Sequence, residues 1–267
     1  MKKNNIVILS ANSDIGAFLT KQFLQKGANV IGTYRNPSPI LNELEAAGAI
    51  LLPLDITSKD QVSVFAEKLK KSSFAWNQLI SASGVLNPIG NFFSTEFDIW
   101  EKSVITNSIA QLRVLHAIYD HRDTKELSKV VFFAGGGTNG PFDNYSAYCI
   151  GKHILIKMTE LLDSESCDLQ VAIIGTGFVN TKIHHQTLAA GFAAGDNYLR
   201  TRAFVMQPEG IVSTLEDVAE CVNWCLSSPR SVVSGRNFSV VHDPWREPNL
   251  LEDLVADPNL FKLRRAT

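Results

Sequence analysis

Short apolar runs alternate with longer stretches of helical periodicity along nearly the whole chain. The runs are rich in Val, Ile, Leu and Phe, as expected for strands that are covered on both faces. The intervening stretches are long enough to be crossover helices, so the strands should be parallel. The pattern predicts one doubly wound α/β domain. The expected strands are 5–9, 28–33, 49–54, 78–82, 129–134, 169–174 and 236–241, and the expected helices are 15–26, 39–47, 58–71, 97–122, 146–165 and 215–227.

Polar residues mark two of the expected helix starts. Thr57 or Ser58 precedes the helix at 59–71, and Thr214 with Asp217 three residues later opens the helix at 215–227.

Two segments interrupt the alternation. Residues 182–213 carry small and basic residues and are expected to form a substrate lid over the sheet edge. Residues 243–267 contain three prolines and are expected to form a C-terminal tail after a domain spanning 1–242, in a position to pack on a neighbouring subunit.

The composition excludes several classes of protein. Hydrophobic residues make up 45% of the 267 positions, which is enough for a large core. The net charge of −2 gives no electrostatic reason to bind nucleic acid or an anionic membrane. No apolar run approaches the length of a membrane span, and Cys221 and Cys225 are expected to be buried free thiols without a metal. We therefore expect a cytoplasmic protein.

The loop after the first expected strand is the first candidate binding site. In a doubly wound sheet, the main-chain N–H groups of this turn and the following helix dipole hold the pyrophosphate of a dinucleotide. Only one glycine is present, and an acidic residue at the helix start either caps the helix or repels a phosphate, so an ordinary β-to-α turn is an equal alternative. The candidate cofactor-binding residues here are Ser10, Asn12, Ser13, Asp14, Ile15 and Gly16.

The end of the second expected strand bears on the choice of cofactor. Arg35 lies 19 residues after Gly16, where an acidic residue would bind the ribose hydroxyls of NAD. An arginine instead suits a 2′-phosphate, which favours NADP over NAD, although a solvated surface arginine is the alternative. Asp55 and Ile56 follow the third strand, where the acid is suited either to the adenine amino group or to a turn. Ser83 and Gly84 let a nucleotide lie close to the main chain after the fourth strand.

Tyr148 and Lys152 are four residues apart on an expected helix, so both side chains point to one side. One such pair is weak evidence by itself. Its position in an ordered series of motifs makes it informative.

The chain resembles the short-chain dehydrogenase/reductase family over nearly its whole length. The loop at 10–16, Asp55, the small residues at 81–84, Asn107, the Tyr148–Lys152 pair and the segment 175–181 occur in the order of that family. The resemblance implies a Rossmann-type fold and hydride transfer between a nicotinamide cofactor and a carbonyl or hydroxyl group. It also implies a homodimer or homotetramer that packs helices 97–122 and 146–165 across two-fold axes.

The resemblance assigns roles to individual residues. Tyr148 would be the general acid or base, and Lys152 would lower its pKa and bind the nicotinamide ribose. Asn107 would bend its helix and hold a water, unless its side chain is tied to local main chain. The remaining expected cofactor contacts are Gly177, Val179 and Thr181.

Three departures from the family pattern weaken the functional prediction, and the first is the loss of two glycines from the loop at 10–16, where Ser10 and Asp14 stand. The Ser or Thr expected 13 residues before Tyr148 is Gly135, within a run of three glycines, and Thr138 or Asn139 is a candidate replacement if the loop folds back. The proline expected after the sixth strand is replaced by Thr176.

These observations lead to an NADP-dependent oxidoreductase as the first hypothesis. The alternatives are a non-catalytic dinucleotide-binding protein and an epimerase- or dehydratase-like enzyme acting on a nucleotide sugar. The substrate is expected to be a small molecule. The basic residues of the expected lid would suit an anionic one, although a solvated basic loop is the simpler explanation; these residues are Lys182, His184, His185, Arg200 and Arg202.

Overall fold

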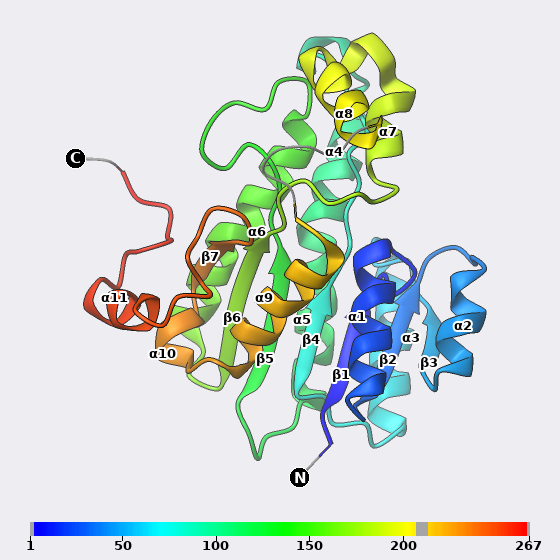
Figure 1. The fold of residues 1–267 in the computed structure, drawn as a ribbon. Coiled ribbons are helices and arrows are strands. Elements are labelled where there is room, and N and C mark those ends of the chain that lie inside the picture. The colour runs from blue at the N-terminus through cyan, green and yellow to red at the C-terminus, as the bar shows by residue number, and fades with distance from the viewer. Residues whose placement is uncertain (1–2, 207–212, 266–267) are drawn as a thin grey trace.

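A parallel sheet of seven strands forms the centre of the protein, in a computed structural model that describes residues 3–206 and 213–265. The strand order is β3-β2-β1-β4-β5-β6-β7, as Figure 1 shows. All seven predicted strands form, and their ends differ from the predicted ones by at most two residues. The strands are β1 (Asn5–Leu9), β2 (Asn29–Tyr34), β3 (Ile50–Pro53), β4 (Gln78–Ser81), β5 (Ser128–Phe133), β6 (Leu169–Gly175) and β7 (Arg236–Ser239).

Helices cover both faces of the sheet, because the central strand β1 carries buried apolar side chains on both of its faces. In β1, Ile6 and Ile8 join a core with α1 and α9, whereas Val7 and Leu9 point to a second core with α3, α5 and α6. This confirms the doubly wound α/β prediction. The helices are α1 (Asp14–Gln25), α2 (Ile40–Ala46), α3 (Lys59–Lys71), α4 (Phe97–Asn107), α5 (Ile109–Ile118), α6 (Ser146–Glu165), α7 (His184–Ala190), α8 (Asp196–Met206), α9 (Leu215–Ser227), α10 (Arg230–Val233) and α11 (Leu250–Ala256).

The predicted single helix at 97–122 is wrong, because the structure divides it into α4 and α5. Ser108 separates them with φ −143° and ψ −83°. The side chains of Asn107 and Ser108 donate hydrogen bonds to the carbonyls of Ser103 and Val104, each four residues back. Such bonds compete with the helix ladder and bend or end it.

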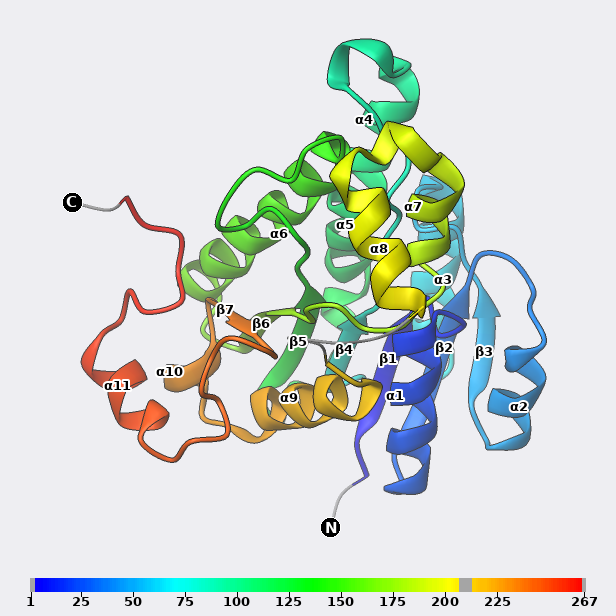
Figure 2. The ribbon, with the colours of Figure 1, turned by 45° about the horizontal axis from the view of Figure 1, so that its top comes forward.

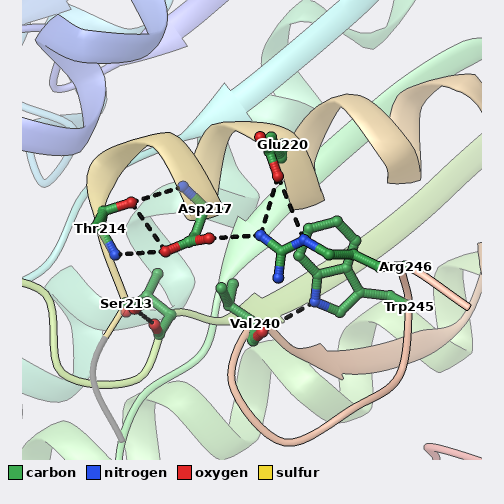
Figure 3. Close-up of polar contacts among 8 residues, drawn as sticks. Ser213, Thr214, Asp217, Glu220, Val240, Trp245 and Arg246 are labelled. Atoms are coloured by element: carbon green, nitrogen blue, oxygen red, sulfur yellow. Dashed lines mark hydrogen bonds and ion pairs between the residues drawn. The ribbon is translucent and has the colours of Figure 1, made fainter.

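The predicted helix starts at Ser58 and Thr214 are confirmed. Ser58 accepts a hydrogen bond from the N–H of Gln61 at the start of α3. Thr214 and Asp217 form a reciprocal capping box at the start of α9, which Figure 3 shows. Cys221 and Cys225 are buried free thiols on the same helix, as predicted.

The segment after residue 242 is part of the domain rather than a separate tail. Arg246 pairs with Asp217 and Glu220 of α9 and lies over the ring of Trp245, whose indole N–H donates to the carbonyl of Val240 (Figure 3). Trp245 is buried in the core around α9, as are Leu250 and Leu254 of α11. Arg264 adds an ion pair to Glu160 of α6. Apolar burial and ion pairs therefore continue beyond residue 242, where the domain was expected to end.

Helices α7 and α8 form most of the segment that was expected to be a lid. Figures 1 and 2 show them beyond the carboxyl ends of the strands, on the side where α4 begins. The hydroxyl of Tyr145, at the start of α6, donates a hydrogen bond to that of Thr187 in α7 at 2.8 Å, which ties this segment to the domain. Residues 207–212 of the expected lid lie outside the described residues.

Candidate active site

A cavity of about 1070 Å³ lies at the carboxyl ends of the strands, above the switch point between β1 and β4. Ligands of open α/β sheets bind at this position, because the loops from the two halves of the sheet diverge there. Gly16 and Asn107 lie behind the cavity wall. The other predicted site residues line it: Ser10, Asn12, Ser13, Asp14, Ile15, Arg35, Asp55, Ile56, Ser83, Gly84, Thr138, Tyr148, Lys152, Gly177, Val179 and Thr181.

The loop after β1 turns tightly although it has a single glycine. Ser10 adopts the left-handed conformation (φ 58°), and its hydroxyl lies 2.7 Å from that of Ser83 after β4. Ser13, rather than Asp14, caps α1 by accepting from the N–H of Gly16. A Cβ at Gly16 would lie 2.3 Å from the carbonyl oxygen of Ser10, so this glycine permits close packing of helix on strand.

Asp14 is held by the segment that follows β6. Its carboxylate accepts a hydrogen bond from the main-chain N–H of Lys182 at 2.6 Å and forms an ion pair with the Lys182 ammonium at 3.6 Å. The same ammonium donates to the carbonyl of Asn12 at 2.9 Å. The lid segment therefore crosses to the loop after β1, and it neutralises the carboxylate that sequence reasoning placed beside a phosphate site.

Arg35 and Asp55 stand at the ends of neighbouring strands. Arg35 is exposed at the cavity, and the described part of the chain provides it with no ion pair. Asp55 accepts from both the N–H and the hydroxyl of Thr57. Burial raises the pKa of Asp55, but these hydrogen bonds and the Arg35 charge outweigh it and hold the pKa below its usual value. Asp55 is thus a turn residue whose charge also faces Arg35.

Tyr148 and Lys152 project from the first turns of α6 to the floor of the cavity. The Lys152 ammonium donates to the carbonyl of Phe133 at 2.8 Å and to that of Ser83 at 3.3 Å, and it lies 5.8 Å from the centre of the Tyr148 ring. Burial lowers the pKa of Lys152 to about 8. Burial raises the pKa of Tyr148, with a smaller contribution from Cys149. In the protein without cofactor, the phenol therefore keeps its proton at neutral pH.

Asn107 does not line the cavity, but its side chain holds one of the loops that do. Its amide accepts from the N–H of Val85 at 3.0 Å and donates to the carbonyl of Val85 at 2.8 Å, so it fixes the loop after β4. A Cβ at Gly151 would lie 2.6 Å from the Cβ of Asn107, so α6 packs closely on this helix end. The Asn107 side chain is thus hydrogen-bonded to main chain, which is one of the two roles that the sequence allows for it.

Comparison with known proteins agrees with this geometry. The sequence profile described as short chain dehydrogenase matches residues 4–190, which include the loop after β1, Asn107 and the Tyr148–Lys152 pair. The chain belongs to the short-chain dehydrogenase family. It is accordingly an oxidoreductase of a family that binds a nicotinamide dinucleotide.

Relatives of this family member span nearly its full length at low identity. An NAD-dependent glycerol dehydrogenase from Listeria innocua is 22% identical over 239 residues, which cover 88% of this chain and 91% of that protein. A short chain dehydrogenase/reductase from Saccharomyces cerevisiae has a TM-score of 0.78 at 19% identity, covering 94% of this chain and 99% of that one. A short chain dehydrogenase from Burkholderia cenocepacia in complex with NADP has a TM-score of 0.72 at 20% identity, covering 88% and 95%. The two structures bear on the fold alone.

The loop after β5 is where this dehydrogenase departs from its family. Gly135 replaces the hydroxyl residue of the family pattern, and a Cβ there would lie 2.2 Å from the Tyr148 hydroxyl oxygen. Thr138 lines the cavity, but its hydroxyl donates to the carbonyl of Gly135 at 3.2 Å. The Thr138 hydroxyl thus donates its proton within the loop, and the replacement of the family hydroxyl by Thr138 or Asn139 stays a prediction.

The segment after β6 is shaped without the family proline. Gly177 has φ 71°, and a Cβ there would meet Val241 at 2.3 Å, so only glycine suits this turn. The carbonyl of Val179 lies 2.9 Å from a ring nitrogen of His184, and His184 stacks on Phe178 with ring centres 5.3 Å apart. These contacts connect the turn to α7 and α8.

Sequence reasoning missed several cavity residues on the lid, the loops and the C-terminal segment. Gln186 accepts from the N–H groups of Leu86 and Asn87, so α7 holds the loop after β4. No spacing in the sequence signals these contacts, since they join segments about 100 residues apart. Cavity-lining residues of this kind are Leu86, Phe142, Phe178, Ile183, Gln186, Thr187, His242, Asp243, Phe261, Lys262 and Leu263.

Within residues 3–206 and 213–265, no group of three or more His, Cys, Asp or Glu side chains is arranged to hold a metal ion. In the same residues, no helix combines the length and the apolar character needed to cross a membrane.

Proposed function

We propose that the protein is an NADP(H)-dependent reductase that transfers hydride between the cofactor and a carbonyl or hydroxyl group, with Tyr148 as general acid. The observation that carries the proposal is the position of Tyr148 and Lys152 on the floor of the one cavity that the loops after β1, β2 and β4 also line. Proton transfer and dinucleotide binding would then take place in one cavity.

The residues at the switch point fit a dinucleotide. The main-chain N–H groups of Asp14 and Ile15 at the start of α1 take part in no hydrogen bond of the described chain, and both residues line the cavity. Unpaired N–H groups at a helix start favour a pyrophosphate. A Cβ at Gly84 would make ordinary van der Waals contacts with Asn107 and Lys152 at 3.6 Å, and Gly84 itself lines the cavity. A bound nicotinamide would supply the hydride.

Arg35 supports NADP over NAD. The position at the end of β2 carries a cation instead of the acid that would bind ribose hydroxyls. An exposed guanidinium without an ion pair is suited to a 2′-phosphate through charge-assisted hydrogen bonds. The known relatives do not distinguish the two cofactors.

The state of Tyr148 supports carbonyl reduction as the favoured direction. Because burial raises its pKa, the phenol holds a proton that it can donate to a carbonyl oxygen as hydride reaches the carbon. Lys152 still carries most of its positive charge at neutral pH, since its pKa is about 8. Its ammonium stabilises the phenolate that remains after proton transfer.

The cavity beneath the lid favours a substrate with an apolar group next to its carbonyl. Leu86, Phe142 and Ile183 line this part of the cavity, whereas Arg200 and Arg202 lie outside the lining. Lys182 is paired with Asp14, and His184 is bonded to Val179. Of the lid residues that suggested an anionic substrate, Lys182 and His184 are therefore engaged, and Arg200 and Arg202 do not line the cavity.

Exposed apolar side chains support the expected homo-oligomer. Ile109 of α5 and Ile150 of α6 are 43% and 48% exposed, on the helices that the family pairs across two-fold axes. Sedimentation of the purified protein tests this expectation.

A paired titration with NADPH and NADH, followed by turnover measurements over a panel of ketones and aldehydes, tests the proposed function. Tighter binding of NADPH and reduction of apolar ketones would support it. A non-catalytic dinucleotide-binding protein is the second candidate, because Gly135 removes a hydroxyl donor from the family site. Binding of NADPH without turnover of any carbonyl compound would favour that candidate.

A further inference from the structure

Gly135 lies directly under the ring of Tyr148, just past the end of β5. A Cβ built on Gly135 would lie 2.2 Å from the Tyr148 hydroxyl oxygen and 2.4 Å from the ring carbon that carries it. Gly135 is not among the residues with positive φ, so its backbone conformation would suit any amino acid. The requirement for glycine is therefore one of space.

The whole glycine run receives side chains from α6 and the loop before it. Gly136 lies against the ring of Phe142, with 3.3 Å between that ring and a Cβ at this position. At Gly137, a Cβ would lie 2.7 Å from the sulfur of Cys149, whose thiol donates to the carbonyl of Gly136. Gly135, Gly136 and Gly137 thus form a cradle for three side chains, which we call the glycine cradle.

The cradle leaves the Tyr148 hydroxyl without a partner in the described chain. The hydrogen bonds of Lys152 go to the carbonyls of Phe133 and Ser83, and the Thr138 hydroxyl bonds to Gly135. Packing rather than hydrogen bonding therefore sets the position of the Tyr148 ring. A side chain at position 135 would push the ring out of that position, because its nearest atoms belong to the stiff phenol and not to a flexible chain end.

We propose that Gly135 is a positioning residue for Tyr148 and that this protein cannot carry the family hydroxyl at position 135 without displacing its catalytic tyrosine. The proposal rests on the proposed function, since it takes Tyr148 as the general acid. It predicts that restoring the family serine inactivates the enzyme instead of repairing it.

The first test compares Gly135→Ser and Gly135→Ala with Gly140→Ala in the same loop. Gly140 has nothing within 4 Å of its Cβ position and no positive φ, so it is a matched control. We expect kcat to fall at least about 100-fold in both Gly135 variants, comparable to loss of a general acid, and to stay within about twofold in Gly140→Ala. The Kd for NADPH should change little. Activity of Gly135→Ser at or above the wild-type level would overturn the proposal.

The second test follows Tyr148 without any turnover. The protein is labelled with carbon-13 at the tyrosine ring carbon that bears the hydroxyl, and Tyr148→Phe assigns the resonance. In the wild type, burial should hold the pKa of the phenol well above its free value, whereas in Gly135→Ala the displaced ring should titrate near the free value of about 10. Identical titration in the two proteins would overturn the proposal.

A thermal-stability cycle covers the case in which the Gly135 variants fold poorly. Gly135→Ala should lower the Tm in the wild type but not in a Tyr148→Ala background, where the colliding ring is absent. An equal loss in both backgrounds would show that Tyr148 is not what the glycine accommodates. If Tyr148→Phe keeps full turnover, the general-acid role fails, while the titration and the cycle still decide the position of the ring.

Discussion

The two halves of the cavity differ in which groups they present to a ligand. The half formed by the loops after β1, β2 and β4 has an N-terminal helix cap, unpaired main-chain N–H groups and a free arginine, all suited to a dinucleotide. The half formed by the loops after β5 and β6, the lid and the C-terminal segment has lost the family serine and proline and has gained a glycine cradle.

Under the proposed function, this difference would separate recognition of the cofactor from recognition of the substrate. A dinucleotide presents the same phosphates to every member of the family, so short loops of fixed geometry suffice to bind it. The substrate half is assembled from segments far apart in sequence, and its shape can change without altering the sheet. Variants in the two halves should therefore fail in different ways.

Tyr148→Phe should have the largest effect, and it should impair turnover without impairing cofactor binding. Loss of the proton donor should lower kcat by about 100-fold or more while the Kd for NADPH stays within about twofold. Steady-state kinetics and fluorescence titration measure the two quantities. Tyr119→Phe, outside the cavity, is the control, and a Tyr148→Phe enzyme with wild-type kcat would remove Tyr148 from the mechanism.

Arg35→Ala should affect the cofactor half alone. Loss of a charge-assisted bond to a 2′-phosphate should weaken NADPH binding by about 10- to 100-fold and leave NADH binding nearly unchanged. Calorimetric titration with both cofactors measures this preference. Arg200→Ala, an exposed arginine outside the cavity lining, should change neither affinity. Equal weakening for NADH would refute the role in selectivity.

Lys152 links the two halves, and its burial predicts a pH dependence of stability. Its pKa is lowered to about 8 in the native protein from 10.5 in the unfolded chain. Between these values the unfolded chain binds a proton that the native protein has lost, so this group raises the free energy of unfolding by about 1.4 kcal/mol per pH unit. Lys152→Met lacks this contribution. Urea denaturation of both proteins between pH 7 and 9.5 measures it, and a pH-independent difference would contradict the burial of the ammonium.

The smallest effect on cofactor affinity should come from breaking the Lys182–Asp14 ion pair, at the contact between the two halves. Lys182→Met leaves the Asp14 carboxylate unpaired beside the expected pyrophosphate site, so NADPH and NADH should both bind about three- to fivefold more weakly, as for an exposed ion pair. Asp14→Asn in the same chain should restore the affinity. Titrations at low and high salt measure this, since salt should reduce the effect. Weakening of NADPH alone would mean that Lys182 acts at the 2′-phosphate.

Most of the fold could be predicted from the sequence because strand and helix periodicity are local. The alternation of apolar runs gave all seven strands, and Thr214 with Asp217 gave the start of α9. The helix break at Ser108 was missed, because apolar periodicity continues through it while two polar side chains bond back to main chain. The C-terminal segment was taken for a tail, since the pairing of Arg246 with α9 has no local signal.

For the candidate site, too, some features follow from the sequence and others only from the tertiary structure. The sequence by itself determined which residues stand at the carboxyl ends of the strands, because strand order and crossover handedness bring those ends together. The tertiary structure alone decided how they are used: Ser13 caps α1, Asp14 pairs with Lys182, and Tyr148 rests on Gly135. These outcomes depend on differences of a few tenths of an ångström in the distances between segments that are remote in sequence. Close packing fixes such distances, and no pattern of residue types encodes them.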